Sequence, residues 1–398
     1  MSEGEAAADA PAAQVAVLRL DLTDFRSYTQ ARLETDGRPV VLTGPNGAGK
    51  TNLLEAVSFL APGRGLRRAR LSEIDRQGGG AWAVAARLSS TSGEIAIGTG
   101  RDGSSETSDR RLVRIDGQSV KGQAALAEYL NLVWLTPQMD RLFQEGAAPR
   151  RRFLDRLVFG YDPSHATRLA AYEQAMRERA RLLRQGGADP SWITVLEDTM
   201  AREGVAVAAS RRDIAQRLDR AATEAAEEAF PVPGLTLTGT AEAWLAEMPA
   251  LDAEERLKRE LAASRRIDAE SGGAVVGPHR ADLAVRHKAK DRAAEHCSTG
   301  EQKALLISIV LAHARLQAAL RGVAPVLLLD EVAAHLDQLR RRALFDHILR
   351  LGGQAWLTGT DAILFAELGA KAHFFTVTDG IIAASPDPAG GGAGRGSP

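Results

Sequence analysis

The sequence predicts an α/β domain that is discontinuous in the chain, because a helical lobe is inserted between its two strand-bearing parts. Residues 15–135 and 272–384 contain short apolar runs bounded by turn signals, which are typical of strands. Residues 136–271 are rich in Ala, Arg, Glu and Leu and poor in β-branched residues, which favours helices. Residues 385–398 are rich in Pro, Gly and Ala and are predicted to be a disordered tail.

Strands of the first part are indicated at residues 15–20 and 38–43, where apolar runs lie between turn-forming residues. In residues 81–117, apolar side chains alternate with others from Trp82 to Leu88, and Gly and Ser clusters interrupt the pattern. This period-two alternation is typical of antiparallel strands with one buried face. The last part is predicted to contain strands at 274–285, 326–329 and 355–358, and a helix that begins at Thr299.

The inserted lobe is predicted to be built from short helices. Apolar residues recur at helical spacing from Tyr172 to Leu183, and a cluster of Gly, Asp and Pro at residues 186–190 breaks this helix from the next. No sustained heptad seam runs through the lobe. A helix of about 40 residues would extend only about 60 Å. Long coiled-coil arms are therefore not expected.

Composition excludes several classes of protein. The chain has 398 residues, 44% apolar and 25% charged, so it is long enough for two cores and shows no sign of disorder as a whole. Its formal net charge is −1, so a nucleic-acid surface would have to be a local patch. One cysteine, Cys297, excludes an internal disulfide framework and a zinc-finger spacing. The N-terminal residues lack the order of a signal peptide, and no continuous apolar run approaches 20 residues, so a cytoplasmic protein without a membrane segment is expected.

A glycine-rich turn between a predicted strand and a helix matches the phosphate-loop pattern G-x-x-x-x-G-K-[ST]. Its glycines allow backbone N–H groups to face phosphates, and the start of the following helix favours an anion. Lys50 would reach the β- and γ-phosphates, and the Thr51 hydroxyl would bind Mg²⁺. A chance Gly-rich turn is the alternative. The predicted nucleotide-binding residues are Gly44, Pro45, Asn46, Gly47, Ala48, Gly49, Lys50, Thr51 and Asn52.

A second part of the site is indicated by two acids at the end of the apolar run 326–329. A strand this apolar is covered on both faces, so its acids emerge at the carboxyl edge of the sheet, where ligands bind. Asp330 would hold Mg²⁺ through water, and Glu331 would orient or deprotonate the attacking water. The alternative is a plain acidic end of a core strand.

The stretch from Ser298 to Glu301 has two interpretations. It forms a capping box before an apolar helix. The same capped helix start, with Ser298 and Gly300, is also a surface rich in donors that suits a γ-phosphate. The stretch resembles the signature of ABC-type ATPases, with Cys297 and Thr299 replacing a leucine and a glycine. In that family two heads sandwich two nucleotides, and each signature covers the phosphate loop of the partner, so the resemblance implies an ATP-dependent homodimer. Asp337 lies where these ATPases have a dimer-contacting loop.

Several further stretches together resemble the RecF family of bacterial recombination mediators over nearly the whole chain. The most specific are 151–155 and 277–283, which transporter cassettes do not carry. Departures from the family are the Asp-Glu acid pair, where many relatives have Asp-Asp, and residues 136–140, where the family usually has Pro-Glu-Asp-Leu. In this place Gln138 would act as the loop residue that senses Mg²⁺ or water. The other stretches that carry the resemblance to this family are 22–28, 51–56 and 63–67.

The resemblance implies a discontinuous ABC-type head and a slow, DNA-stimulated ATPase that uses ATP and Mg²⁺. It also implies a clamp on double-stranded DNA beside single-stranded gaps, which works with RecR and RecO to load the recombinase RecA in gap repair, replication restart and the SOS response. Arg26 would flank the adenine. Candidate DNA contacts are Arg64, Arg67, Arg68, Arg70, Arg151 and Arg152. Each of these arginines could instead belong to a solvated or ion-paired face.

Two other functions remain open at the level of sequence. One is the ATPase cassette of a membrane transporter or another SMC-like ATPase, although Thr358 and the residues after it stand where transporters have a histidine. The other is a binding module in which ATP only stabilises a dimer and its turnover is incidental.

Overall fold

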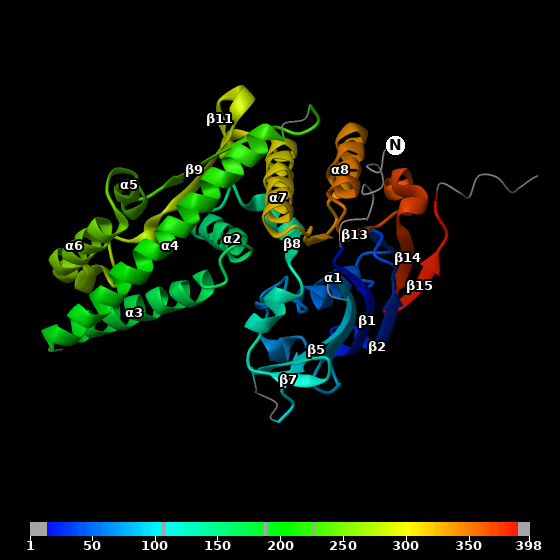
Figure 1. The fold of residues 1–398 in the computed structure, drawn as a ribbon, viewed down its shortest axis with the longest axis horizontal. Coiled ribbons are helices and arrows are strands. Elements are labelled where there is room, and N and C mark those ends of the chain that lie inside the picture. The colour runs from blue at the N-terminus through cyan, green and yellow to red at the C-terminus, as the bar shows by residue number, and fades with distance from the viewer. Residues whose placement is uncertain (1–13, 92, 105–108, 187–188, 226–227, 389–398) are drawn as a thin grey trace, which may run out of the picture. The chain divides into compact units, whose positions relative to one another are not determined.

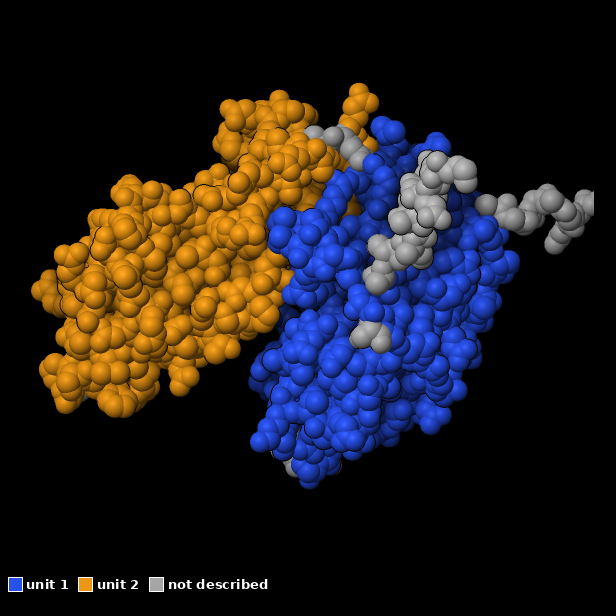
Figure 2. All heavy atoms as spheres, in the orientation of Figure 1, with its two compact units in different colours: residues 1–139, 314–398 blue, residues 140–313 orange. Residues whose placement is uncertain are grey.

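The computed structural model describes residues 14–91, 93–104, 109–186, 189–225 and 228–388. The chain divides into two compact units, unit 1 of residues 1–139 and 314–398, and unit 2 of residues 140–313 (Figure 2). Part of the predicted tail, residues 389–398, lies outside the described residues. The compact unit 2 extends beyond the predicted lobe, 136–271, and the functional domain boundaries stay a prediction.

Unit 1 contains a six-stranded mixed sheet in the order β15-β14-β3-β13-β12-β8. The strands β14, β3, β13, β12 and β8 are all parallel to one another, and β15 is antiparallel to β14. The buried pattern of β3 and β12 confirms the expectation that these short apolar runs form covered strands. The strands are β3 (Val40–Thr43), β8 (Leu132–Leu135), β12 (Val326–Leu329), β13 (Ala355–Gly359), β14 (His373–Thr378) and β15 (Ile381–Ser385).

A second six-stranded sheet of unit 1 is antiparallel, in the order β2-β1-β4-β5-β6-β7. Alternation of buried and exposed residues along β4 confirms the antiparallel strands predicted within 81–117. The strands are β1 (Ala16–Phe25), β2 (Tyr28–Glu34), β4 (Ala83–Ser90), β5 (Gly93–Arg101), β6 (Arg111–Ile115) and β7 (Gln118–Val120).

Helix α1 (Lys50–Ser58) shares one core with both sheets. Its Leu53 and Val57 are fully buried in the same apolar cluster as Leu22 of β1 and Trp356 of β13. Burying an aliphatic side chain of this size contributes about 2 kcal/mol. The start of α1, which carries the phosphate loop, is therefore held by packing on two sides. Unit 1 also contains α8 (Gln338–Leu351) and the short 3₁₀ helices η1 (Leu71–Glu73), η2 (Ala124–Glu128), η7 (Ala333–His335) and η8 (Ala362–Lys371).

Unit 2 is mainly helical, and α3 and α4 run side by side in it (Figure 1). Buried Arg179 on α3 donates to Glu197 on α4 at 2.9 Å and to Asp268 on α6 at 2.7 Å, which ties three helices together. The longest helix, α4, has 35 residues and is about 50 Å long, so coiled-coil arms are absent from the described part of the lobe. The helices are α2 (Ala147–Phe159), α3 (His165–Gln185), α4 (Pro190–Glu224), α5 (Thr240–Glu247) and α6 (Ala250–Ser271).

A three-stranded antiparallel sheet, in the order β11-β10-β9, corrects two expectations about this region. Strand β9 (Pro233–Thr238) lies within the segment expected to be helical. The sequence pattern missed it because β10 (Asp282–His287), with which it pairs, is distant in sequence. The strand expected at 274–285 begins only at Asp282, because residues before it form the 3₁₀ helix η4 (Pro278–Arg280). The third strand is β11 (Arg292–Ala293), and further 3₁₀ helices are η5 (Lys288–Lys290) and η6 (Ala294–His296).

Helix α7 (Thr299–Arg321) begins in unit 2 and ends in unit 1. By length and composition alone it is the one helix among the described residues that could cross a membrane, although polar residues interrupt it and it is no continuous apolar run. However, 67% of its most apolar window is buried inside the protein. Burial of this kind is also found in core helices of proteins that have no membrane span.

Buried His313 on α7 provides a pH-dependent contribution to stability. Its Nε2 lies 3.0 Å from the Leu157 carbonyl oxygen, and burial lowers its pKa from 6.5 to about 4. The unfolded chain binds this proton below pH 6.5 and the folded chain only near pH 4. The contribution is therefore complete above pH 6.5 and is lost as the pH falls to 4. We expect the free energy of unfolding to lose about 3 kcal/mol over this range through this residue.

Urea unfolding midpoints of the native chain and the His313→Gln variant, measured from pH 7 to pH 4, test this expectation. The variant should show a flatter pH dependence. His296→Gln is the control, because its side chain is 72% exposed and its replacement should leave the slope unchanged. Equal slopes for His313→Gln and the native chain would contradict the prediction.

Candidate functional site

The turn between β3 and α1 has the backbone conformation of a phosphate loop. Gly44, Gly47 and Gly49 have φ angles of 146°, 81° and 112°. A Cβ on Gly44 would lie 2.0 Å from the Val377 carbonyl oxygen, and one on Gly49 would lie 2.6 Å from the Tyr28 hydroxyl oxygen. Side chains at these two positions would therefore collide with the structure, and glycine is required at both.

Lys50 is the first residue of α1, and its side chain folds back over the loop. Its Nζ donates to the carbonyl oxygens of Gly44 at 2.7 Å and Pro45 at 2.8 Å. Only 4% of the residue is exposed, and this burial lowers the pKa of Lys50, although Glu331 and Asp330 oppose the shift. An ammonium group held in this position can turn to a phosphate oxygen that enters the loop.

A network of hydrogen bonds joins the phosphate loop to the acids that follow β12. The Thr51 hydroxyl donates to Asp330 Oδ1 at 2.9 Å and lies 3.1 Å from its Oδ2. The Thr358 hydroxyl also donates to Asp330 Oδ1, at 2.7 Å, and accepts from the backbone N–H of Glu331 at 2.9 Å. The structure therefore brings together Thr51, Asp330 and Glu331, which are distant in sequence.

Thr358 is a residue of the site that sequence reasoning did not identify, since it served only to argue against a transporter cassette. It lies at the end of β13, and the parallel pairing of Leu329 with Leu357 puts it beside the two acids. Its hydroxyl fixes the orientation of the Asp330 carboxylate and the Glu331 backbone. A polar residue at the carboxyl end of a central strand could have been the signal.

Glu331 has a φ of 52°, in the left-handed region that non-glycine residues seldom adopt. Such strain costs about 1–3 kcal/mol and persists where the surrounding structure imposes it, commonly at functional sites. The N–H bond to Thr358 is one such constraint.

The arrangement fits a magnesium ion. Thr51 and Asp330 supply oxygen ligands within 2.9 Å of each other, and Mg²⁺ prefers one or two protein oxygens together with phosphates and water. The described residues contain no group of three or more His, Cys, Asp and Glu side chains that could hold a metal by themselves. Gln138 lies in η3 (Pro137–Arg141), which follows β8, the strand that pairs with β12. Its role as a Mg²⁺ or water sensor stays a prediction.

Arg26 and Arg67, predicted to contact adenine and DNA, both bind the fully buried carboxylate of Glu55 on α1. Arg26 forms two hydrogen bonds to it, at 2.8 and 2.9 Å, and Arg67 one at 2.9 Å. Arg67 also donates to Asn52 Oδ1 at 2.8 Å. Two guanidinium groups thus compensate one buried charge directly beside the phosphate loop, so both arginines position α1.

The other arginines of this segment, Arg64, Arg68 and Arg70, are exposed. None of these three arginines forms an ion pair with a described residue, so their charges are available to a ligand. The loop before them is held by Arg111, whose guanidinium donates to the carbonyl oxygen of Gly63 at 2.9 Å. Burial lowers the pKa of Arg111 to about 10.

In unit 2, the structure confirms the capping box at the start of α7. The Ser298 N–H donates to Glu301 Oε2 at 2.9 Å, and the Glu301 N–H lies 3.4 Å from the Ser298 hydroxyl oxygen. Lys290, followed by Ser298, lowers the pKa of Glu301 to about 2. Ser298 and Gly300 are exposed, and a Cβ on Gly300 would meet nothing within 4 Å. The capped helix start is therefore open to a ligand.

Two side chains of α7 hold this helix start in place. Gln302 donates to the Cys297 carbonyl oxygen at 2.9 Å, and Lys303 forms an ion pair of 3.3 Å with Asp140. Asp140 lies two residues after Gln138, so one end of η3 is tied to the signature helix. In unit 1, Asp337 caps α8 by accepting from the Arg340 N–H at 2.9 Å. In the structure Asp337 therefore lies at a helix start, and its contact with a partner chain stays a prediction.

Arg151 and Arg152, the remaining predicted DNA contacts, lie on α2 in unit 2. Arg151 is half-buried and donates to the Ala281 carbonyl oxygen at 2.7 Å, whereas Arg152 is exposed. Both line a cavity of the lobe.

Comparison with known proteins identifies the family. The sequence model of the "RecF/RecN/SMC N terminal domain" matches residues 16–380. The DNA replication and repair protein RecF of Allorhizobium ampelinum is 52% identical over 364 residues, which cover 91% of this chain and 97% of that protein. The chain belongs to the RecF family. The RecF protein of Rhizobium johnstonii is also 52% identical, over 93% of this chain and 99% of its own length.

The fold agrees with this membership. A solved structure of the recombination mediator protein RecF-ATPrS in the RecFOR pathway has a TM-score of 0.80 at 22% identity and covers 93% of this chain and 98% of that one. The Smc head domain from Pyrococcus furiosus has a TM-score of 0.51 at 16% identity and covers 93% of this chain and 96% of its own. These likenesses confirm the predicted ABC-type ATPase head for this RecF family member.

Proposed function

We propose that this RecF family member is an ATPase of DNA recombination and repair, whose two nucleotide sites are completed by pairing of two chains. The observation that carries the proposal is the network of Thr51, Asp330, Thr358 and Glu331 beside the phosphate loop. It supports the proposal because the Thr51 and Asp330 oxygens, 2.9 Å apart, would suit Mg²⁺, and Glu331 follows Asp330 directly. The names of the relatives support a role in DNA replication and repair.

Within this site, Lys50 and the loop N–H groups bind the phosphates of ATP, and Thr51 and Asp330 hold Mg²⁺, which neutralises the phosphate charge. Glu331 orients or deprotonates the attacking water. Arg26 acts near the nucleotide by binding Glu55 on α1, the helix that follows the phosphate loop. The similarity to RecF-ATP and RecF-ATPrS structures supports ATP as the nucleotide.

Pairing of two chains follows from the open helix start at Ser298 and Gly300. The capping box uses the N–H groups of Ser298 and Glu301 and leaves out those of Thr299 and Gly300, which suit a γ-phosphate. The resemblance to ABC-type ATPases assigns that phosphate to the partner's nucleotide. Such an interface is self-complementary under two-fold symmetry. Slow, DNA-stimulated hydrolysis, cooperation with RecR and RecO, recombinase loading and a cytoplasmic location complete the proposal. Membership of the RecF family favours it over a transporter cassette.

DNA binding is proposed for the exposed arginines of unit 1, Arg64, Arg68 and Arg70. Duplex DNA carries a dense row of phosphates, and each phosphate contact adds about 0.9 to the slope of log affinity against log salt. Replacing all three by Gln is expected to reduce that slope by about 2–3. By contrast, the effect of replacing Arg67 would include disruption of its bonds to Glu55 and Asn52.

Sedimentation tests both the pairing of two chains and the binding of DNA. It is measured with and without ATP, with a duplex that has a single-stranded gap, and over a salt series. ATP should convert monomer to dimer, and the dimer should hold DNA with a steep salt dependence. The triple arginine variant should dimerise normally but bind DNA with the reduced salt slope given above, and Arg259→Gln on the exposed face of α6 is the control. A chain that dimerises but ignores DNA would retain the ATPase proposal and refute the DNA clamp.

A further inference from the structure

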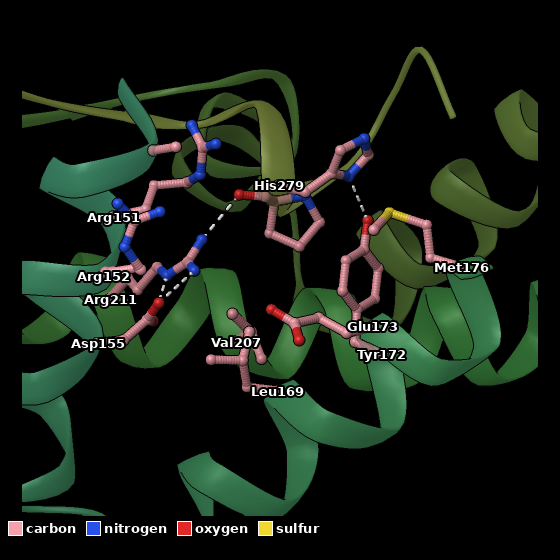
Figure 3. Close-up of a pocket in the computed structure, with 12 residues that line it drawn as sticks. Arg151, Arg152, Asp155, Leu169, Tyr172, Glu173, Met176, Val207, Arg211 and His279 are labelled. Carbon is pink, nitrogen blue, oxygen red and sulfur yellow. Dashed lines mark hydrogen bonds and ion pairs between the residues drawn. The ribbon is translucent and has the colours of Figure 1, made fainter. Parts of the chain in front are cut away.

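A cavity of about 160 Å³ lies inside unit 2, between α2, α3, α4 and η4 (Figure 3). We call it the lobe pocket. Guanidinium groups of Arg151, Arg152 and Arg211 gather on one side of it, and Leu169 and Val207 lie at its base (Figure 3). The two stretches most specific to the family resemblance, 151–155 and 277–283, both contribute to its walls, yet the proposed ATPase function uses neither.

The walls of the lobe pocket are fixed by internal hydrogen bonds. Arg211 binds the buried Asp155 through two bonds, at 2.7 and 2.8 Å, and donates to the Pro278 carbonyl oxygen at 2.7 Å. On the opposite wall the Tyr172 hydroxyl lies 2.6 Å from His279 Nδ1 (Figure 3). A Cβ on Gly277 would approach that hydroxyl to 2.3 Å, so the backbone is packed closely against the tyrosine. The pocket is therefore preformed.

The cationic wall is not fully compensated by acids. Asp155 is occupied by Arg211 and by His165, whose Nε2 lies 2.8 Å from it. Arg151 has a carbonyl partner but no carboxylate partner among the described residues, and burial followed by repulsion from Arg211 lowers its pKa. Arg152 is exposed, and none of the described residues forms an ion pair with it.

Three further acids face this region without changing that balance. Asp282 attracts Arg151, but Arg150 binds its carboxylate through two bonds of 2.7 Å. Glu173, across the pocket from the arginines (Figure 3), pairs with Arg177 at 3.6 Å. Glu242 on α5 is 3% exposed, and burial raises its pKa, which reduces its negative charge. An anion bound beside Arg151 and Arg152 would relieve the remaining repulsion, and guanidinium forks match the geometry of a carboxylate.

We propose that the lobe pocket binds a single carboxylate joined to an apolar group no larger than one side chain. The carboxylate contacts Arg151 and Arg152, and the apolar group lies on Leu169, Val207 and Met176. A cavity of this volume is much too small for duplex DNA. The C-terminal residue of a peptide and a free organic acid both have this chemistry. The pocket gives Arg151 and Arg152 a ligand other than the DNA phosphates predicted from sequence.

The probe for the test is N-acetyl-leucine, titrated into the full chain. The methyl signal of Met176 is the readout, since only five methionines are present and Met176→Leu assigns its signal. We expect saturable binding with a dissociation constant on the order of 1 mM. N-acetyl-leucinamide, which lacks the carboxylate, and N-acetylglycine, which lacks the apolar side chain, should both bind about tenfold more weakly.

Arg152→Gln should weaken N-acetyl-leucine binding about tenfold, and Arg259→Gln should leave it unchanged. Acetyl-Gly-Gly-Leu distinguishes a peptide C-terminus from a free organic acid, because only a site for a peptide terminus accepts the two added glycines. Either result retains the carboxylate chemistry of the proposal. Three results would each overturn the proposal. They are equal binding of N-acetyl-leucine and its amide, normal binding by Arg152→Gln, and no shift of the Met176 signal at an N-acetyl-leucine concentration 20-fold above the expected dissociation constant of about 1 mM.

Discussion

Replacing Lys50 by Met is expected to weaken ATP binding by about 100-fold or more. The ammonium group would contribute charge-assisted hydrogen bonds to phosphate oxygens, and a loss of two such bonds corresponds to about 3 kcal/mol. The same group donates to the carbonyl oxygens of Gly44 and Pro45, so the loop would also lose bonds that hold it in shape. Equilibrium titration with a fluorescent ATP analogue measures the effect.

The control for this variant is Lys121→Met, an exposed lysine in the same unit. Its affinity for the analogue should equal that of the native chain. Urea unfolding of both variants separates loss of ligand contacts from loss of folded protein. An affinity of Lys50→Met within threefold of the native value would show that the phosphates bind elsewhere, and the phosphate-loop assignment would be wrong.

Replacing Glu331 by Gln is expected to slow ATP hydrolysis by about 100–1,000-fold while ATP binding stays nearly unchanged. Gln has nearly the same shape and preserves the backbone N–H bond to Thr358, but it cannot accept a proton from water. The bonds of Asp330 to Thr51 and Thr358 do not involve the Glu331 side chain, so the magnesium-binding oxygens should keep their positions. The chain should therefore accumulate as an ATP-bound dimer.

Single-turnover hydrolysis and sedimentation with ATP measure these two properties, and Glu367→Gln, an exposed acid in unit 1, is the control. A persistent dimer that fails in DNA repair after loading would show that turnover matters for function. Full repair with the slow variant would instead favour a binding module with incidental hydrolysis. Undiminished hydrolysis would mean that Glu331 is not the catalytic base.

Local patterns in the sequence determined much of this protein. The phosphate loop, the buried strand before Asp330 and the capping box at Ser298 each depend on residues within one short segment. Glycine is needed for positive φ angles, an apolar run indicates a covered strand, and a Ser-x-x-Glu spacing satisfies a helix start. These constraints act between neighbours in the chain, so they can be recognised without knowledge of the tertiary fold.

Partners from distant segments were decided only by the tertiary structure. Thr358 meets Asp330 because β13 pairs in register with β12, and β9 forms because β10 supplies its hydrogen bonds. Arg67, which the sequence marks only as a basic residue, is committed to Glu55, and the lobe pocket unites three helices and η4. Composition reveals that a charge exists, but only folding determines which group lies opposite it, because ion pairs and register depend on distances in space.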